Sequence, residues 1–157
     1  FPNSKIFIPY RDPIQQAYSL LNQHNKFIED SNQDNFISKY MKWIGHSEFG
    51  PNYTPIHRKK IQYTDDLDIN HWIEQWYLTY KSCFETLKDK SNVNFICYEK
   101  LCKSKDHWSN ILKILNIKEN YDFTFQESQK EICIDYDNQI SNKALYVYSQ
   151  LYQLNKN

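Results

Sequence analysis

The chain has 157 residues, a length that suits one domain with a single hydrophobic core. Hydrophobic residues make up 40% of the chain and aromatic residues 17%, which argues against an intrinsically disordered protein. Nineteen basic and nineteen acidic residues give a formal net charge of zero, so no long-range field attracts nucleic acids or anionic membranes.

The same sequence contains no apolar run of membrane-spanning length. Its first residues, "FPNSKIFIPYRDP", lack the basic and apolar regions of a signal peptide. The four cysteines include no Cys-x-x-Cys pair, which favours reduced thiols. We therefore predict a cytoplasmic protein with no nucleic-acid and no membrane partner.

The first predicted elements are a short strand and a helix. Residues 5–10, "KIFIPY", are mostly apolar, as in a strand buried on both faces. Asp12 is suited to cap a helix, and Pro13 to its first turn. Apolar residues at helical spacing then predict a helix over 13–28. A second helix is predicted over 35–44, with an apolar stripe made of Phe36, Tyr40, Trp43 and Ile44.

Both glycines and two prolines lie in the following segment, "GHSEFGPNYTPIHRKK" over 45–60, which predicts a long loop. A helix over 70–88 follows, and then a buried strand over 93–98. The rest of the chain is predicted as a helix over 106–116, a polar connection over 120–137 and a last helix over 139–154.

Two buried strands separated by helices predict a parallel α/β fold, helix-rich and with a short sheet. Two strands alone make a small sheet with unpaired edges, so we expect either that the pattern hides further strands or that part of the domain is missing from the chain. We further expect that the chain self-associates through an exposed sheet edge, which covers the unpaired groups and the apolar surface beside them.

The ends of the two strands carry the most site-like residues. Arg11 follows the first strand and precedes a helix start, where free N–H groups and a guanidinium favour a bound anion. Ligands of open α/β folds bind at the carboxyl ends of the strands, which is where Arg11 lies. Ser19 lies two turns further along the helix, and Tyr98 ends the second strand. The alternative is structural: Arg11 pairs locally with Asp12 or a nearby carboxylate, Ser19 is a small helix residue and Tyr98 is a core tyrosine.

Three segments resemble the sulfotransferases that use 3'-phosphoadenosine 5'-phosphosulfate (PAPS). "FIPYRDPIQQAYS" is similar to their 3'-phosphate-binding segment, and "WIEQWYLTY" to a tryptophan-bearing helix. "NFICYEKLCKSKDHWSNILKILNI" resembles a later strand that ends in Tyr-Glu-Asp-Leu, with Lys100 here in place of the acidic residue. The order and approximate spacing agree over residues 5–117.

The resemblance implies a single sulfotransferase-like domain over 1–157 with a P-loop NTPase-like fold. It implies transfer of a sulfuryl group from PAPS to a hydroxyl or amine of a small-molecule or glycan acceptor, which leaves 3'-phosphoadenosine 5'-phosphate (PAP) and requires no metal. Arg11 and Ser19 would hold the 3'-phosphate, and Tyr98 would lie near the adenosine. His46 and Glu48, in the long loop, are candidates for contact with the acceptor, and no catalytic residue is identified.

The departures from the family are equally specific. The family's Gly- and Lys-containing loop for the 5'-phosphosulfate is absent, since neither Gly45 nor Gly50 lies between a strand and a Lys-Ser/Thr helix start. The Arg-Lys-Gly segment of cytosolic members is also absent. We therefore expect a C-terminal fragment that is inactive in isolation. Two alternatives stay open: a non-catalytic nucleotide-binding or assembly domain of the same fold, and a P-loop-type kinase.

Overall fold

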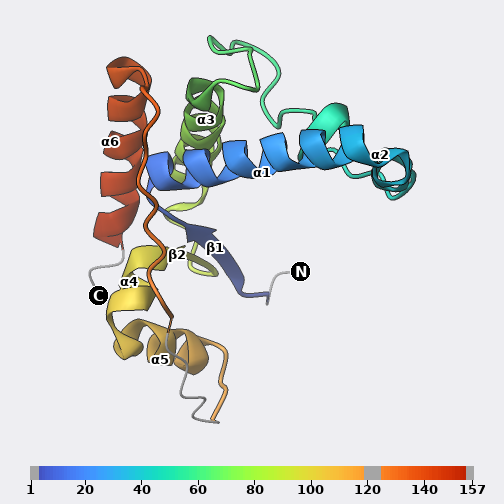
Figure 1. Cartoon of the computed structure of the whole chain (residues 1–157). Helices are drawn as coiled ribbons and strands as arrows, with labels where there is room; N and C mark the ends of the chain where they lie inside the picture. Colours follow the sequence, from blue (N-terminus) through green and yellow to red (C-terminus); the bar gives the residue numbers. More distant parts are fainter. Residues whose placement is uncertain (1–3, 119–124, 155–157) are drawn as a thin grey trace.

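The computed structural model describes residues 4–118 and 125–154 and shows a helix-rich α/β structure with a two-stranded parallel sheet (Figure 1). Strand β1 (Ile6–Tyr10) pairs in parallel with β2 (Val93–Cys97), so that Ile6 lies opposite Val93 and Tyr10 opposite Cys97. The predicted parallel arrangement is confirmed. Both strands end at one edge of the sheet, which brings the residues that follow them together.

The helices take up most of the remaining chain. They are α1 (Pro13–Gln33), α2 (Asn35–Trp43), the short 3₁₀ helix η1 (Gly50–Asn52), α3 (Ile69–Leu87), α4 (Tyr98–Lys103), α5 (Lys105–Ile114) and α6 (Asn138–Leu154). Residues 125–137 run as an extended segment alongside α6 before they enter it (Figure 1). This agrees with the predicted polar connection, of which residues 120–124 lie outside the described part of the chain.

The predicted boundaries of most elements differ from those of the structure by one or two residues, and two differences change the local structure. The helix predicted to end at residue 28 continues to Gln33, where Asp34 adopts an extended conformation and its carboxylate caps α2. The second strand ends at Cys97 and not at residue 98, because Tyr98 begins the unpredicted helix α4. A helix of six residues is too short to show an apolar period, so the sequence pattern could not reveal it.

Helix α2 forms where it was predicted, but its apolar stripe is not inside the protein. None of its residues is buried, and the side chains of Phe36 and Trp43 are 68% and 82% exposed. Figure 1 shows α2 at the far end of α1, away from the other helices. The helical spacing predicted the element correctly, and the apolar stripe that it defines is exposed.

The core lies where α1, α3 and α6 pack against one another and against the sheet. Ala17 of α1 and Ala144 of α6 are fully buried, which lets the helix backbones approach closely. Trp72 and Trp76 of α3 bury nearly all of their large side chains in the same cluster. The buried core residues are Tyr10, Ile14, Ala17, Leu21, Ile69, Trp72, Ile73, Trp76, Phe95, Cys97, Ile140, Ala144, Val147 and Leu151.

Polar side chains of α3 hold the long loop that precedes it. The carboxylate of Glu74 accepts hydrogen bonds from the backbone N–H groups of Gln62 and Tyr63, at 2.9 to 3.0 Å. The side-chain amide of Gln75 pairs with both the N–H and the carbonyl of His57, each at 2.9 Å. The loop therefore has a defined path against α3 although it contains little regular structure.

His24 of α1 is the buried contact between this helix and the loop. Its side chain is 1% exposed, and its Nδ1 accepts a hydrogen bond from the N–H of Gly50 at 3.1 Å. The ring lies against Trp72, and Nε2 is 3.7 Å from an Asp66 carboxylate oxygen. Burial lowers the pKa of His24, and the neighbouring Asp66 carboxylate opposes this shift only in part.

Because its pKa is lowered, His24 makes the stability of the folded chain depend on pH. Below the unfolded-state pKa of about 6.5, the unfolded chain binds a proton that the folded chain resists, so stability falls as pH decreases. We predict that His24→Asn, which keeps an acceptor near the Gly50 N–H but does not titrate, loses less stability than the parent chain between neutral and mildly acidic pH. Urea denaturation at the two pH values measures this, and equal losses in both proteins would contradict it.

Candidate functional site

A cleft of about 300 Å³ lies where the carboxyl ends of β1 and β2 meet the start of α1. Arg11 and Gln15 line it from the side of β1 and α1, and Tyr98 from the end of β2. The rest of its lining comes from Asp12, Glu99, Lys103, Glu127, Ser128, Gln129, Tyr148 and Tyr152. The parallel register therefore places two of the predicted site residues in one cleft.

Arg11 and Tyr98 are in direct contact. The guanidinium carbon of Arg11 lies 4.9 Å from the centre of the Tyr98 ring, a cation–π geometry. The guanidinium also donates a hydrogen bond to the backbone carbonyl of Ser128. Within the described residues no carboxylate forms an ion pair with Arg11, so the predicted alternative of a local pair with Asp12 is not what the structure shows.

Asp12 instead caps α1, as predicted. Its Oδ1 accepts hydrogen bonds from the N–H groups of Ile14 at 3.0 Å and of Gln15 at 2.9 Å. Two amides of the helix start are therefore already satisfied. Because of this, the guanidinium of Arg11 is the donor at this strand end best placed to hold an anion.

Glu99, to which sequence reasoning assigned no role, connects the elements around the cleft. Its Oε1 accepts a hydrogen bond from the backbone N–H of Asp12 at 2.8 Å. Its Oε2 accepts one from the Tyr148 hydroxyl of α6 at 3.0 Å and one from the Cys97 thiol at 3.2 Å. Burial raises the pKa values of both Tyr148 and Cys97, so both groups remain protonated donors near neutral pH.

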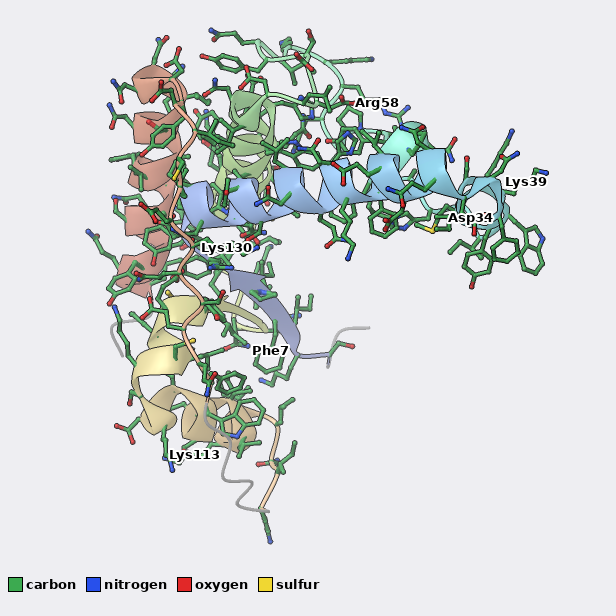
Figure 2. The ribbon with its side chains drawn as sticks, in the orientation of Figure 1. Phe7, Asp34, Lys39, Arg58, Lys113 and Lys130 are labelled. Atoms are coloured by element: carbon green, nitrogen blue, oxygen red, sulfur yellow. The ribbon has the colours of Figure 1, made fainter. Side chains whose placement is uncertain are left out.

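The segment 126–130 crosses the cleft and is held mainly through its backbone. The Tyr98 hydroxyl donates to the carbonyl of Gln126 at 2.8 Å and accepts from the N–H of Ser128 at 3.1 Å. The side-chain amide of Gln15 pairs with the carbonyl and the N–H of Lys130, both at 3.0 Å. Figure 2 shows Lys130 beside the start of α1. The Arg11 and Tyr98 side chains thus already have partners whose positions a ligand could take.

Ser19 is not among the residues that line this cleft. It lies half-buried in α1, eight residues beyond Arg11, which corresponds to about 12 Å along a helix axis. The structure therefore brings Arg11 and Tyr98 together and leaves Ser19 further along the same helix.

His46 and Glu48 form a second, separate pair. The Nδ1 of His46 lies 2.7 Å from Oε2 of Glu48, which also accepts the N–H of Ser47 at 3.0 Å. Hydrogen bonds from backbone N–H groups lower the pKa of Glu48. Glu48 lines another cavity, between α1, the loop and α3, and that cavity shares no lining residue with the Arg11 cleft.

Comparison with known proteins gives no relative: no family model, no curated protein and no solved structure matches this chain. Across residues 4–118 and 125–154, no helix is long and apolar enough to cross a membrane. In the same ranges no three His, Cys, Asp or Glu side chains are grouped so that they could hold a metal ion.

The contacts of Glu99 predict that truncating its side chain lowers the free energy of unfolding substantially. Glu99→Ala would leave the Asp12 N–H and the Tyr148 hydroxyl without their acceptor, so we expect a loss of about 2 kcal/mol in the free energy of unfolding. Glu99→Gln, which keeps one acceptor oxygen, should lose less. The matched control is Glu85→Ala on α3, whose exposed pair with Lys81 stabilises by at most about 0.5 kcal/mol. Urea denaturation of the three variants tests this, and equal costs for Glu99→Ala and Glu85→Ala would refute it.

Proposed function

We propose that this chain forms the 3'-phosphate-binding part of a PAPS-dependent sulfotransferase with a P-loop NTPase-like fold. The observation that carries the proposal is the contact of Arg11 with Tyr98 in one cleft at the carboxyl ends of two parallel strands. The resemblance implied that these two residues serve the phosphate and the adenosine of a single nucleotide, which requires them to be neighbours.

The charges around the cleft are compatible with a bound phosphate. Arg11 and Lys103 supply two cations. The lining also holds three carboxylates: Asp12 is engaged with the start of α1, Glu99 with three donors, and Glu127 with the side-chain amide of Gln129. A phosphate dianion is a stronger acceptor for a guanidinium than a neutral carbonyl, so it would replace the Ser128 carbonyl as the partner of Arg11.

In the complete enzyme, the sulfuryl group would move by in-line displacement. The bond between sulfur and the bridging oxygen of PAPS breaks, a bond from sulfur to the acceptor oxygen or nitrogen forms, and the acceptor loses a proton. The part of this chain is positioning: Arg11, with Tyr98 against its guanidinium, fixes the nucleotide by its 3'-phosphate. No residue of this chain is assigned as the base that accepts the proton.

Calorimetric titration with PAP and with adenosine 5'-monophosphate tests the proposal, because these two nucleotides differ only in the 3'-phosphate. We expect PAP to bind more tightly, and Arg11→Ala to abolish the difference. The expected loss is about 1.5–3 kcal/mol for a charged hydrogen bond, or roughly 10- to 150-fold in affinity. Arg11→Lys keeps the charge but not the planar fork, so it should restore only part of the preference.

The matched control is Arg58→Ala, since Arg58 is the only other arginine of the chain and lies in the long loop, far from Lys130 in Figure 2. This variant should bind PAP like the parent chain. Equal affinity of the parent chain for both nucleotides would reject the proposal. Preference for ATP with no effect of the 3'-phosphate would favour the kinase alternative instead.

A further inference from the structure

The cavity beside Glu48 has the size of a small-molecule site. It measures about 550 Å³ and lies between α1, the loop residues 47–56 and α3. Five of its lining residues are aromatic: Phe49, Tyr53, Trp72, Trp76 and Tyr80. These five rings, called the aromatic wall, form two contacting groups: Trp72 lies 5.9 Å from Phe49 and 4.9 Å from Tyr53 between ring centres, and Trp76 lies 4.6 Å from Tyr80.

This aromatic wall is held in place before any ligand binds. The side chains of Trp72 and Trp76 are each 3% exposed, so the core fixes them. The indole N–H of Trp72 donates to the carbonyl of Asp66 at 2.9 Å, and that of Trp76 to the side-chain carbonyl of Gln16 at 3.1 Å. The buried indoles support the half-buried rings of Phe49, Tyr53 and Tyr80, so a ligand meets ring surfaces that do not have to be ordered on binding.

Most polar groups of the cavity already have partners inside the protein. The side-chain amide of Gln75 forms hydrogen bonds with both the N–H and the carbonyl of His57, and the Thr79 hydroxyl contacts the His57 ring. The Tyr53 hydroxyl contacts Nε2 of His71 at 2.9 Å. A densely hydroxylated ligand would find few donors and acceptors here, whereas an apolar or cationic group would find the faces of the rings.

The charge of the cavity has one sign. Its lining contains Glu48 and no lysine, arginine or histidine. The Glu48 carboxylate contacts the backbone N–H of Ser47 and the His46 ring, and as a group with about four acceptor sites it can accept a further donor from a ligand. A carboxylate beside aromatic rings attracts an organic cation and repels an organic anion.

We propose that this cavity binds an organic ammonium ion with an aromatic or apolar body, its charge directed at the aromatic faces and the Glu48 carboxylate. Under the proposed function this molecule is the acceptor, an amine, and that role alone rests on the sulfotransferase assignment. The binding itself rests on the cavity and is tested without any nucleotide.

Three probes with the same phenethyl body and head groups of different charge provide the test: phenethylamine, phenethyl alcohol and 3-phenylpropionate. Calorimetry at neutral pH gives the affinities, and quenching of tryptophan fluorescence reports contact with the aromatic wall. We expect the amine to bind about tenfold more tightly than the alcohol, and the carboxylate to bind most weakly.

Two variants locate the binding in this cavity. Glu48→Gln removes the negative charge and should reduce the preference for the amine to about threefold or less, with no change for the alcohol. Ile56→Lys adds a positive charge at a lining residue that is 80% exposed, so the fold should stay intact. Of the three probes, the amine alone should bind more weakly to this variant. The control is Glu29→Gln, an exposed carboxylate of α1 outside the cavity, which should bind all three probes like the parent chain.

Equal affinity for the amine and the alcohol would overturn the proposal, as would preference for 3-phenylpropionate or the absence of binding for every probe at millimolar concentration. An amine preference that survives both Glu48→Gln and Ile56→Lys would place the site elsewhere and overturn it as well. The PAP titration fails or succeeds independently: amine binding without PAP preference would refute the donor site and leave this cavity assignment standing.

Discussion

The carboxylate of Glu99 is the interaction on which the geometry of the candidate site depends. It accepts three hydrogen bonds: from the backbone N–H of Asp12 after β1, from the Cys97 thiol at the end of β2, and from the Tyr148 hydroxyl of α6. Two short parallel strands make few hydrogen bonds with each other. An acceptor shared by the residues at their ends therefore does much to fix the positions of these two chain segments. Arg11 and Tyr98 directly precede Asp12 and Glu99 in the chain, so the hydrogen bond between Asp12 and Glu99 holds together the two segments that carry them.

The local order of elements could be predicted from the sequence because the signals are local. The apolar run before Arg11, the cap at Asp12 and the proline at residue 13 together indicate a strand and the start of a helix, and the structure confirms both. The parallel pairing followed from two apolar strands with helices between them. The burial of both faces predicted for the first strand is wrong, since Tyr10 is the one buried residue of β1. The exposure of the apolar face of α2 could not be predicted, because an apolar stripe shows that a helix has one apolar face and does not show whether another element covers it.

The candidate site was predictable only in part for the same reason. Arg11 and Tyr98 each follow a strand, so the parallel register alone predicts that they meet. The role of Glu99 depends on Tyr148, which is 49 residues away, and no local pattern reveals that contact. The second cavity likewise joins residues of α1, the loop and α3, so the separate sequence signals of Glu48 and Trp76 did not predict a common site.

The two outer sides of the sheet are not equivalent. The N–H of Ile6 donates to the carbonyl of Asn92, so alternation along β1 directs the backbone groups of Phe7 and Pro9 away from β2. Pro9 has no N–H, and its carbonyl accepts the Tyr80 hydroxyl at 2.7 Å. The predicted self-association through a sheet edge stays a prediction, but a strand added beside β1 would find one complete donor and acceptor pair, at Phe7. The outer side of β2, which has no proline, offers a better edge, and a cleft of about 280 Å³ runs along it.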